Sequence, residues 1–180
     1  ESVCQGHWNY ELSIPIRRLK SMTVGVIGIG RIGKSFAEMV RPLAGRILGV
    51  DPRYGKRKDD HPEYIELVDL ESVLRESDVV SIHCPLETAR NLINSHTLSL
   101  MKPSAYLINV SRGGIIDELA LATALKEGKL AGAGIDVTQI EPLPMASPLR
   151  EAPNFLCTPH MAWYSEQASS DLKTKVAEEI

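Results

Sequence analysis

The chain has 180 residues, 43% of them hydrophobic, and this length and composition fit a single domain with one substantial core. A formal net charge of -3 argues against direct nucleic-acid binding, and the lack of any apolar run of roughly 18 to 20 residues argues against a membrane-spanning segment. The three cysteines lie far apart, which argues against a disulfide framework and favours a reducing, cytoplasmic setting.

Short apolar runs rich in β-branched residues alternate along the chain with patterns of helical period. The apolar runs predict six strands, at residues 22–27, 47–50, 79–83, 105–110, 132–137 and 154–157. Apolar stripes at helical spacing predict helices between them, over 32–43, 70–74 and 121–125. Asp69 and Asp117 stand where N-caps belong, and Gly128 follows the third helix at a C′ position.

The predicted strands are continuously apolar rather than alternating, which indicates burial on both faces of the sheet. Strands that alternate with helices favour right-handed crossovers between parallel strands. The sequence therefore predicts an α/β fold, a doubly wound parallel sheet in three layers with helices on both faces.

The most specific motif is the run Gly28-Ile29-Gly30-Arg31-Ile32-Gly33, which follows the first strand and opens the first helix. This is the context that the dinucleotide-binding fingerprint of Rossmann-type domains requires. Gly28 permits a tight turn, Gly30 lets the backbone approach a pyrophosphate, and Gly33 lets helix and strand pack closely. The free N–H groups of the helix N-terminus then favour an anionic ligand.

Asp51 comes directly after the second strand, 18 residues past Gly33. A carboxylate at this place accepts hydrogen bonds from the hydroxyls of an adenosine ribose and repels a 2′-phosphate, so NAD is favoured over NADP. Because Arg53 stands two residues later, NADP remains the alternative cofactor. The alternative is that the glycines form an ordinary tight turn and that Asp51 only contacts solvent.

Ligands of open α/β sheets gather outside the carboxyl ends of the strands, and this sequence places reactive side chains there. Arg112 follows the fourth strand, Glu141 follows the fifth, and His160 follows the sixth. An arginine can hold a substrate carboxylate with two hydrogen bonds, and a histidine can donate a proton to a carbonyl oxygen. A carboxylate such as Glu141 would stabilise the charged histidine and fix its tautomer. These three types suit the reduction of a 2-oxo acid.

Each of these residues also has a plainer interpretation when it is taken alone. Arg112 could lie on the surface beside a helix, and Glu141 could be an ordinary loop carboxylate. His160 could be a structural histidine, as we expect for His83. Cys157 and His160 have a CxxH spacing, but no second ligand pair accompanies them, so we expect no metal site.

Several motifs resemble, in order and spacing, those of the D-isomer-specific 2-hydroxyacid dehydrogenases, from about residue 20 to the end of the chain. Besides the glycine run they are His83-Cys84-Pro85-Leu86, Asn109-Val110-Ser111-Arg112-Gly113-Gly114, Gly134-Ile135-Asp136-Val137, Glu141-Pro142 and Thr158-Pro159-His160.

The resemblance implies a Rossmann-type NAD domain, with Arg112, Glu141 and His160 in the catalytic positions and a small 2-oxo or 2-hydroxy acid as substrate. It also implies that Asp51 holds the adenosine ribose, that Arg31 and Ile32 lie by the pyrophosphate, that Asp136 meets the nicotinamide carboxamide, and that the protein is a homodimer. The expected cofactor-binding set is Gly28, Gly30, Arg31, Ile32, Gly33, Asp51, Cys84, Pro85, Ser111 and Asp136.

Residues 163–168 are most similar to the C-terminal-binding-protein corepressors and, more loosely, to D-lactate dehydrogenases. Trp163 and Tyr164 either pack under a last helix capped by Ser165 or contact the substrate. The loop over 85–91 departs from the family pattern near the cofactor: it is one residue shorter than is usual and has Glu87 where Thr or Ser is common.

We therefore expect residues 1–180 to be one NAD-binding domain, with about 1–20 as a remnant of an interdomain connection or helix and without the family's N-terminal substrate domain. The predicted function is hydride transfer between NAD(H) and a D-2-hydroxy acid/2-oxo acid pair, with poor turnover by this chain alone. The alternative is an NAD-responsive, corepressor-like scaffold. A Rossmann domain for another nucleotide is disfavoured by Asp136 together with the three catalytic candidates.

Overall fold

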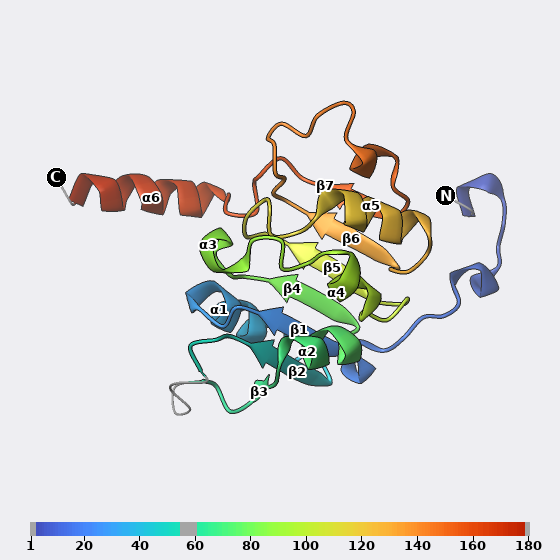
Figure 1. Ribbon diagram of the computed structural model, residues 1–180, viewed down its shortest axis with the longest axis horizontal. Helices are drawn as coiled ribbons and strands as arrows, with labels where there is room; N and C mark the ends of the chain where they lie inside the picture. Colours follow the sequence, from blue (N-terminus) through green and yellow to red (C-terminus); the bar gives the residue numbers. More distant parts are fainter. Residues whose placement is uncertain (1–2, 55–60, 179–180) are drawn as a thin grey trace.

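The computed structural model of the protein describes residues 3–54 and 61–178. Seven strands form one parallel sheet in the order β3-β2-β1-β4-β5-β6-β7 (Figure 1). The strands are β1 (Thr23–Ile27), β2 (Arg46–Val50), β3 (Glu66–Leu67), β4 (Val79–Ile82), β5 (Tyr106–Asn109), β6 (Gly132–Ile135) and β7 (Phe155–Cys157). From β1 the chain adds strands outward to β3, then crosses back to place β4 on the other side of β1 and continues outward to β7. The predicted doubly wound fold is therefore confirmed.

Six α-helices connect or follow the strands in the part of the chain that the structure describes. They are α1 (Arg31–Val40), α2 (Leu70–Glu76), α3 (Leu86–Ala89), α4 (Ser95–Ser99), α5 (Glu118–Lys126) and α6 (Glu166–Glu178). Four short 3-10 helices, η1 (Val3–Gln5), η2 (Tyr10–Ser13), η3 (Leu19–Ser21) and η4 (Pro148–Glu151), accompany them. The three predicted helical stripes correspond to α1, α2 and α5. Helices α3 and α4 are too short to show a helical period.

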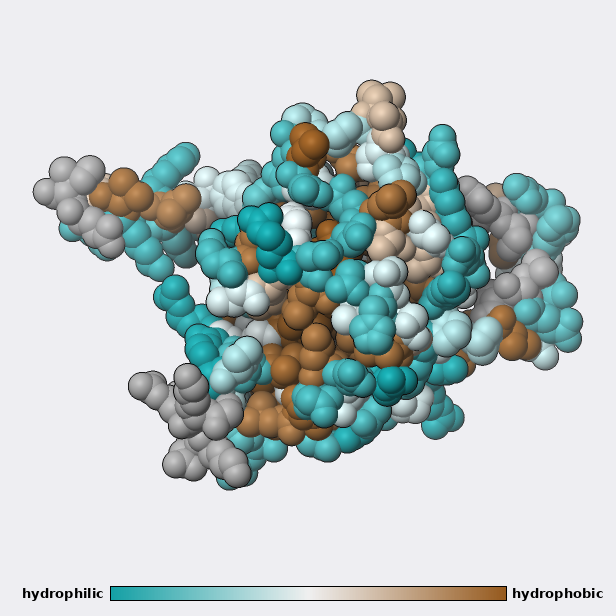
Figure 2. Space-filling model, in the orientation of Figure 1, coloured by the Kyte–Doolittle hydropathy of each residue, from teal (hydrophilic) through white to brown (hydrophobic). Residues whose placement is uncertain are grey.

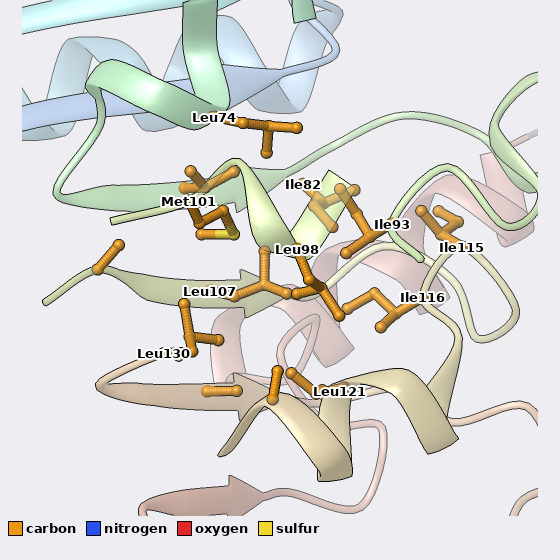
Figure 3. Close-up of a cluster of buried hydrophobic side chains, with 14 of the residues drawn as sticks. Leu74, Ile82, Ile93, Leu98, Met101, Leu107, Ile115, Ile116, Leu121 and Leu130 are labelled. Carbon is orange, nitrogen blue, oxygen red and sulfur yellow. The ribbon is translucent and has the colours of Figure 1, made fainter. Parts of the chain in front are cut away.

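The two faces of the sheet are covered by different helices. Val26 of β1 packs in the same cluster as Ala37 of α1, whereas its neighbour Ile27 packs with Val73 of α2. Because successive side chains of a strand point to opposite faces, α1 and α2 lie on opposite sides of the sheet. The larger cluster continues along the α2 side, where Figure 3 shows Leu74, Ile82, Leu107 and Leu121 converging from α2, β4, β5 and α5.

The predicted helix caps are confirmed. Asp69 Oδ1 accepts a hydrogen bond from the Ser72 amide at 2.7 Å, and Asp117 Oδ1 accepts one from the Ala120 amide at 3.0 Å. Gly128 follows α5 with φ +66°, the left-handed conformation that favours glycine at C′. Ser165 Oγ likewise accepts from the Ala168 amide at 2.9 Å, so Ser165 caps the last helix.

Two details differ from the prediction. A seventh strand, β3, extends the sheet beyond β2, and its two residues are too few to show any period. In α1, Ile32 and Met39 are 70% and 66% exposed, while Gly33 and Ala37 are buried. The apolar stripe thus located the helix and part of its inner face. Phe36 and Val40 pack against the core as predicted, but Gly33 and Ala37 make the closest approach to the sheet because they are small.

The two ends of the described chain extend from opposite sides of the sheet (Figure 1). Residues 3–20 contain η1 and η2, and those whose burial is described are exposed. At the other end α6 projects from the body with no buried residue among those described. Across the described ranges, no helix is both long and apolar enough to cross a membrane.

Candidate functional site

The glycine turn after β1 has the geometry that the fingerprint predicts. Gly28 has φ +92°, and a Cβ added there would lie 2.7 Å from the carbonyl carbon and oxygen of His83. A Cβ on Gly33 would overlap the carbonyl oxygen of Gly28. Both positions therefore require glycine, one for the turn and its close approach to the end of β4, the other for the approach of α1.

The N-terminus of α1 opens from this turn. Gly30 is the N-cap residue and provides no side chain to cap the helix, so the first N–H groups stay available to an anion. Gly30, Arg31 and Ile32 line a hollow of about 670 Å³ whose other wall includes Ala162. The predicted pyrophosphate contacts thus line the same hollow as Ala162, in the segment that follows His160.

A second cavity, of about 430 Å³, lies at the carboxyl ends of β1, β2 and β4. Its walls combine polar and apolar residues. On the face drawn in Figure 2, hydrophobic residues gather in the middle of the molecule and hydrophilic residues surround them. Of the predicted cofactor-binding residues, it is lined by Gly28, Gly30, Asp51, Cys84 and Pro85. Sequence reasoning missed its apolar wall, formed by Leu70, Ala89 and Leu92, because Ala89 and Leu92 belong to short connections without a period. An apolar wall beside a carboxylate suits an adenosine.

Asp51 is buried at the rim of this cavity and is held by four hydrogen bonds. Its Oδ2 accepts from the Ile29 amide at 2.9 Å and from Arg53 Nη2 at 2.6 Å. Its Oδ1 accepts from the Arg53 amide at 3.0 Å and from Arg53 Nε at 2.9 Å. The Arg53 guanidinium, more than any other group, holds the pKa of Asp51 below its usual range, so this carboxylate is ionised at neutral pH.

Two further strand-end residues have structural surroundings. The His83 ring lies 4.9 Å from the Phe36 ring, and its Nε2 is 2.9 Å from Ser81 Oγ, in agreement with the expected structural histidine. Burial raises the pKa of the Cys84 thiol to about 11, so it stays protonated at neutral pH. The hydroxyl of Ser111 donates to the Cys84 carbonyl and ties the end of β5 to that of β4.

Burial lowers the pKa of His83 from its ordinary value of 6.5 to about 4. Between these two pH values His83 is neutral in the folded protein, whereas an exposed histidine would be protonated. The unfolded chain binds that proton near pH 6.5, and so stability present above pH 6.5 is lost as the pH falls towards 4. We expect the unfolding free energy of the wild type to fall by about 2 to 3 kcal/mol relative to His83→Gln between pH 7 and pH 4. Urea unfolding of both proteins across this range measures it, and parallel pH profiles would contradict the buried neutral state.

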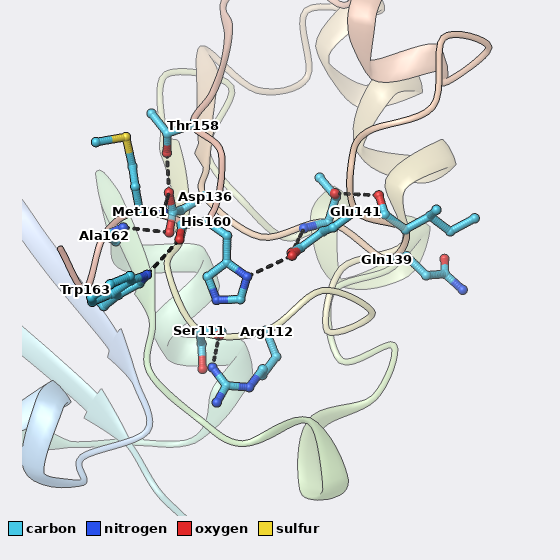
Figure 4. A network of polar contacts seen from close by, with 12 residues as sticks. Ser111, Arg112, Asp136, Gln139, Glu141, Thr158, His160, Met161, Ala162 and Trp163 are labelled. Atoms are coloured by element: carbon cyan, nitrogen blue, oxygen red, sulfur yellow. Dashed lines mark hydrogen bonds and ion pairs between the residues drawn. The ribbon is translucent and has the colours of Figure 1, made fainter. Parts of the chain in front are cut away.

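Asp136 organises the loop that carries His160. Its Oδ1 accepts from the Met161 amide and its Oδ2 from the Ala162 amide, each at 2.9 Å, and the hydroxyl of Thr158 donates to Oδ1 (Figure 4). Burial opposes ionisation of Asp136, but these hydrogen bonds outweigh it and hold its pKa below the usual range. Asp136 thus turns the chain after β7 around a buried carboxylate.

This loop places His160 in an uncommon backbone conformation. His160 has φ +51°, and its amide donates to the Asp136 carbonyl at 2.9 Å. Residues other than glycine rarely adopt this left-handed region, and such conformations concentrate at functional sites. Trp163 Nε1 adds a hydrogen bond to the His160 carbonyl at 3.0 Å. Trp163 is 57% exposed, so it does not pack under α6, and this hydrogen bond ties it to the histidine loop.

His160 and Glu141 form a pair, as the sequence predicts. His160 Nδ1 and Glu141 Oε2 lie 2.8 Å apart, and Glu141 Oε1 accepts from the Thr138 amide at 3.1 Å (Figure 4). The hydrogen bond with His160 is the main cause that lowers the pKa of Glu141 below its usual range. An ionised Glu141 orients the imidazole so that Nε2 is the nitrogen turned away from the pair.

Arg112 reaches the same edge of the sheet from β5. Asn109 of β5 and Cys157 of β7 are both register partners of Ile135 in β6, the strand between them. Arg112 and His160 therefore each lie three residues beyond the same level of the sheet, on the two sides of β6. Arg112 is exposed, and its Nη1 donates to the Ser111 carbonyl at 2.7 Å. The Asn109 side chain bridges this loop, since it accepts from the Ser111 amide and donates to the Arg112 carbonyl.

A third cavity, of about 520 Å³, adjoins the His160–Glu141 pair and includes Asp136 and Cys157 in its walls. Among residues 3–54 and 61–178, no three His, Cys, Asp or Glu side chains lie together in a way that could hold a metal ion. The site holds hydrogen-bonding and proton-carrying groups at the same edge of the sheet as the 430 Å³ cavity. Sequence reasoning missed the supporting roles of Asn109, Thr158 and Trp163, which depend on contacts between strand ends.

The family model of the D-isomer specific 2-hydroxyacid dehydrogenase NAD-binding domain matches residues 1–162, so the similarity includes the first twenty residues. A glycerate dehydrogenase of Methylorubrum extorquens is 39% identical over 99% of this chain and 57% of its own length. A putative 2-hydroxyacid dehydrogenase of Haemophilus influenzae is 40% identical over 92% of this chain and 53% of its own length.

The fold is similar to that of an NAD-dependent formate dehydrogenase from Staphylococcus aureus in complex with NAD, with a TM-score of 0.86 and 29% identity over 98% of this chain and 53% of that one. The chain spans a little over half the length of these relatives. All three are named as dehydrogenases, which favours the enzyme over the corepressor-like alternative. The chain belongs to the D-isomer specific 2-hydroxyacid dehydrogenases and is an NAD-binding domain of that family.

Proposed function

We propose that the protein interconverts a D-2-hydroxy acid and its 2-oxo acid with NAD(H) as cofactor. The observation that carries the proposal is the pair of His160 and Glu141, 2.8 Å apart, at the sheet edge that Arg112 also reaches and that borders the nucleotide cavity. A bound nicotinamide cofactor would supply the hydride acceptor for oxidation of the hydroxy acid and the hydride donor for reduction of the oxo acid.

Arg112 binds the substrate carboxylate. Its guanidinium is exposed and offers five N–H donors in a planar fork, the geometry that matches a carboxylate. The bridge that Asn109 makes across residues 111 and 112 fixes the backbone from which this side chain extends. Two hydrogen bonds to one end of the acid orient the neighbouring carbon for reaction.

His160 exchanges the proton of the substrate oxygen. With Nδ1 paired to the ionised Glu141, Nε2 is the position that gives a proton to the 2-oxo oxygen during reduction and takes it back from the hydroxyl during oxidation. The rigid loop around Asp136 keeps the ring from rotating out of line. Glu141 acts through His160 and is a positioning residue.

The cofactor is held by features that fit it. The turn at Gly28 and the open N-terminus of α1 would bind the pyrophosphate, and Asp51 would bind the adenosine ribose. Cys84, Pro85 and Ser111 would lie along its path towards Asp136 and the nicotinamide. A homodimer and a cytoplasmic location stay predictions, as does the interpretation of residues 1–20 as a remnant of an interdomain connection.

The test is NADH oxidation with a panel of 2-oxo acids that differ in side chain, measured for this chain and for the complete gene product. Arg112→Lys keeps the charge but loses the fork, so we expect at least a tenfold rise in KM for the oxo acid with an unchanged Kd for NADH. Arg75→Lys, on the exposed end of α2, is the matched control and should behave as wild type. Tight NADH binding by the complete gene product without turnover of any 2-oxo acid would contradict the proposal.

A further inference from the structure

The carboxylate that should receive the adenosine ribose is already occupied by the protein itself. Both Asp51 oxygens accept two hydrogen bonds each, three of the four from Arg53 and one from Ile29. A carboxylate has about four lone-pair positions, so the ribose hydroxyls find no free acceptor on Asp51 in this arrangement. Two of the four bonds come from the Arg53 side chain, which can move.

The Arg53 guanidinium also lies across the path of the nucleotide. Its Nη2 is 3.3 Å from the position that a Cβ on Gly30 would occupy, so it reaches from Asp51 to the glycine turn. Arg53, Asp51 and Gly30 all line the same cavity. The Arg53 side chain is 68% exposed while that of Asp51 is 5% exposed, so the arginine covers the carboxylate from the solvent side.

We propose that Arg53 determines cofactor selectivity: it competes with the ribose of NAD for Asp51 and binds the 2′-phosphate of NADP, so that the site accepts both NAD(H) and NADP(H). This inference rests on the nucleotide site of the proposed function and names its ligand class more closely. It does not depend on the oxidoreductase reaction.

Charge explains both halves of the proposal. An uncovered Asp51 would repel a 2′-phosphate, but paired with Arg53 the two side chains carry no net charge. Arg53 uses Nε and Nη2 on Asp51, and the Nη1 edge of the guanidinium carries further N–H donors for phosphate oxygens. NAD offers no phosphate there and must displace two charge-assisted hydrogen bonds before its hydroxyls reach Asp51.

The experiment measures binding rather than activity. NADH and NADPH are each titrated into this chain, with nicotinamide fluorescence as the readout, for the wild type, Arg53→Ala and Arg75→Ala. We expect the two wild-type Kd values to lie within about tenfold of each other. In Arg53→Ala, NADH should bind equally or more tightly and NADPH more weakly, so that the ratio of the two Kd values rises at least tenfold. Arg75→Ala removes an exposed arginine of α2 and should match the wild type.

A second variant tests the role of Asp51 apart from that of Arg53. Asp51→Asn removes the negative charge and should weaken NADH binding while NADPH binding is maintained or improves. An unchanged Kd ratio in Arg53→Ala, or equal weakening of both cofactors, would overturn the inference. A wild type that binds NADH but excludes NADPH more than a hundredfold would overturn it and leave the proposed function intact. A wild type that binds neither would overturn both.

Discussion

Replacing His160 with asparagine is expected to lower kcat/KM for 2-oxo acid reduction by about 10² to 10⁴-fold, the usual contribution of a positioned general acid. Asparagine is chosen because His160 has φ +51°, a conformation that asparagine adopts more readily than most residues, so the loop around Asp136 should keep its shape. The Kd for NADH should change less than twofold. Steady-state kinetics of the complete gene product, with NADH titration alongside, measure both quantities.

Glu141 provides an internal check on this prediction. Because Glu141 acts through the His160 ring, Glu141→Gln should lower kcat/KM less than His160→Asn, and the double variant should be no worse than His160→Asn alone. His96→Gln changes an exposed histidine at the start of α4 and serves as the matched control. If the effects of the two site variants simply add, the histidine and the carboxylate do not act as one unit.

The second large effect is expected at Gly33. In Gly33→Ala the new Cβ would overlap the carbonyl oxygen of Gly28, a backbone atom that cannot rotate away. Helix α1 must then move off the turn, which costs about 1 to 3 kcal/mol of stability as an overpacked contact and displaces the N–H groups meant for the pyrophosphate. We expect the Kd for NADH to rise at least tenfold, with urea unfolding and fluorescence titration as the measurements.

Gly128→Ala is the matched glycine control. Gly128 has a positive φ, unlike Gly33 in α1, but a Cβ there would meet nothing within 4 Å, and the residue lies after α5, away from the glycine turn. This variant should lose some stability through backbone strain and keep its NADH affinity. Normal NADH binding by Gly33→Ala would show that the close approach of α1 to the turn is unnecessary for the cofactor.

The catalytic candidates are assembled by neighbouring strands rather than by neighbouring residues. Arg112, Glu141 and His160 follow β5, β6 and β7, which pair in that order, and the carboxyl ends of parallel strands share one edge. The nucleotide cavity lies at the same edge between β1, β2 and β4. A proton carrier and a cofactor site therefore meet because the sheet is wound outward in both directions from β1 and β4.

The sequence alone determined the fold class, the glycine turn and the identity of the strand-end residues. Six apolar runs and the run over 28–33 are local patterns, and local patterns of period and spacing specify strands, helices and turns without knowledge of distant contacts. The caps at Asp69 and Asp117 belong to the same class, because an N-cap bonds to its own helix.

Only the tertiary structure decided how those residues are used. No periodic pattern records contacts between distant segments or the orientation of side chains. Such contacts and orientations decide that Arg53 covers Asp51, that residues 158–162 wrap around Asp136, and that Gly33 and Ala37 lie on the inner face of α1. Strand β3 has two residues and forms only by pairing with the edge of β2. Local propensity determines which segments form strands and helices. The energy of packing and of charge pairing across the sheet determines which face of each element is buried and which residues it contacts.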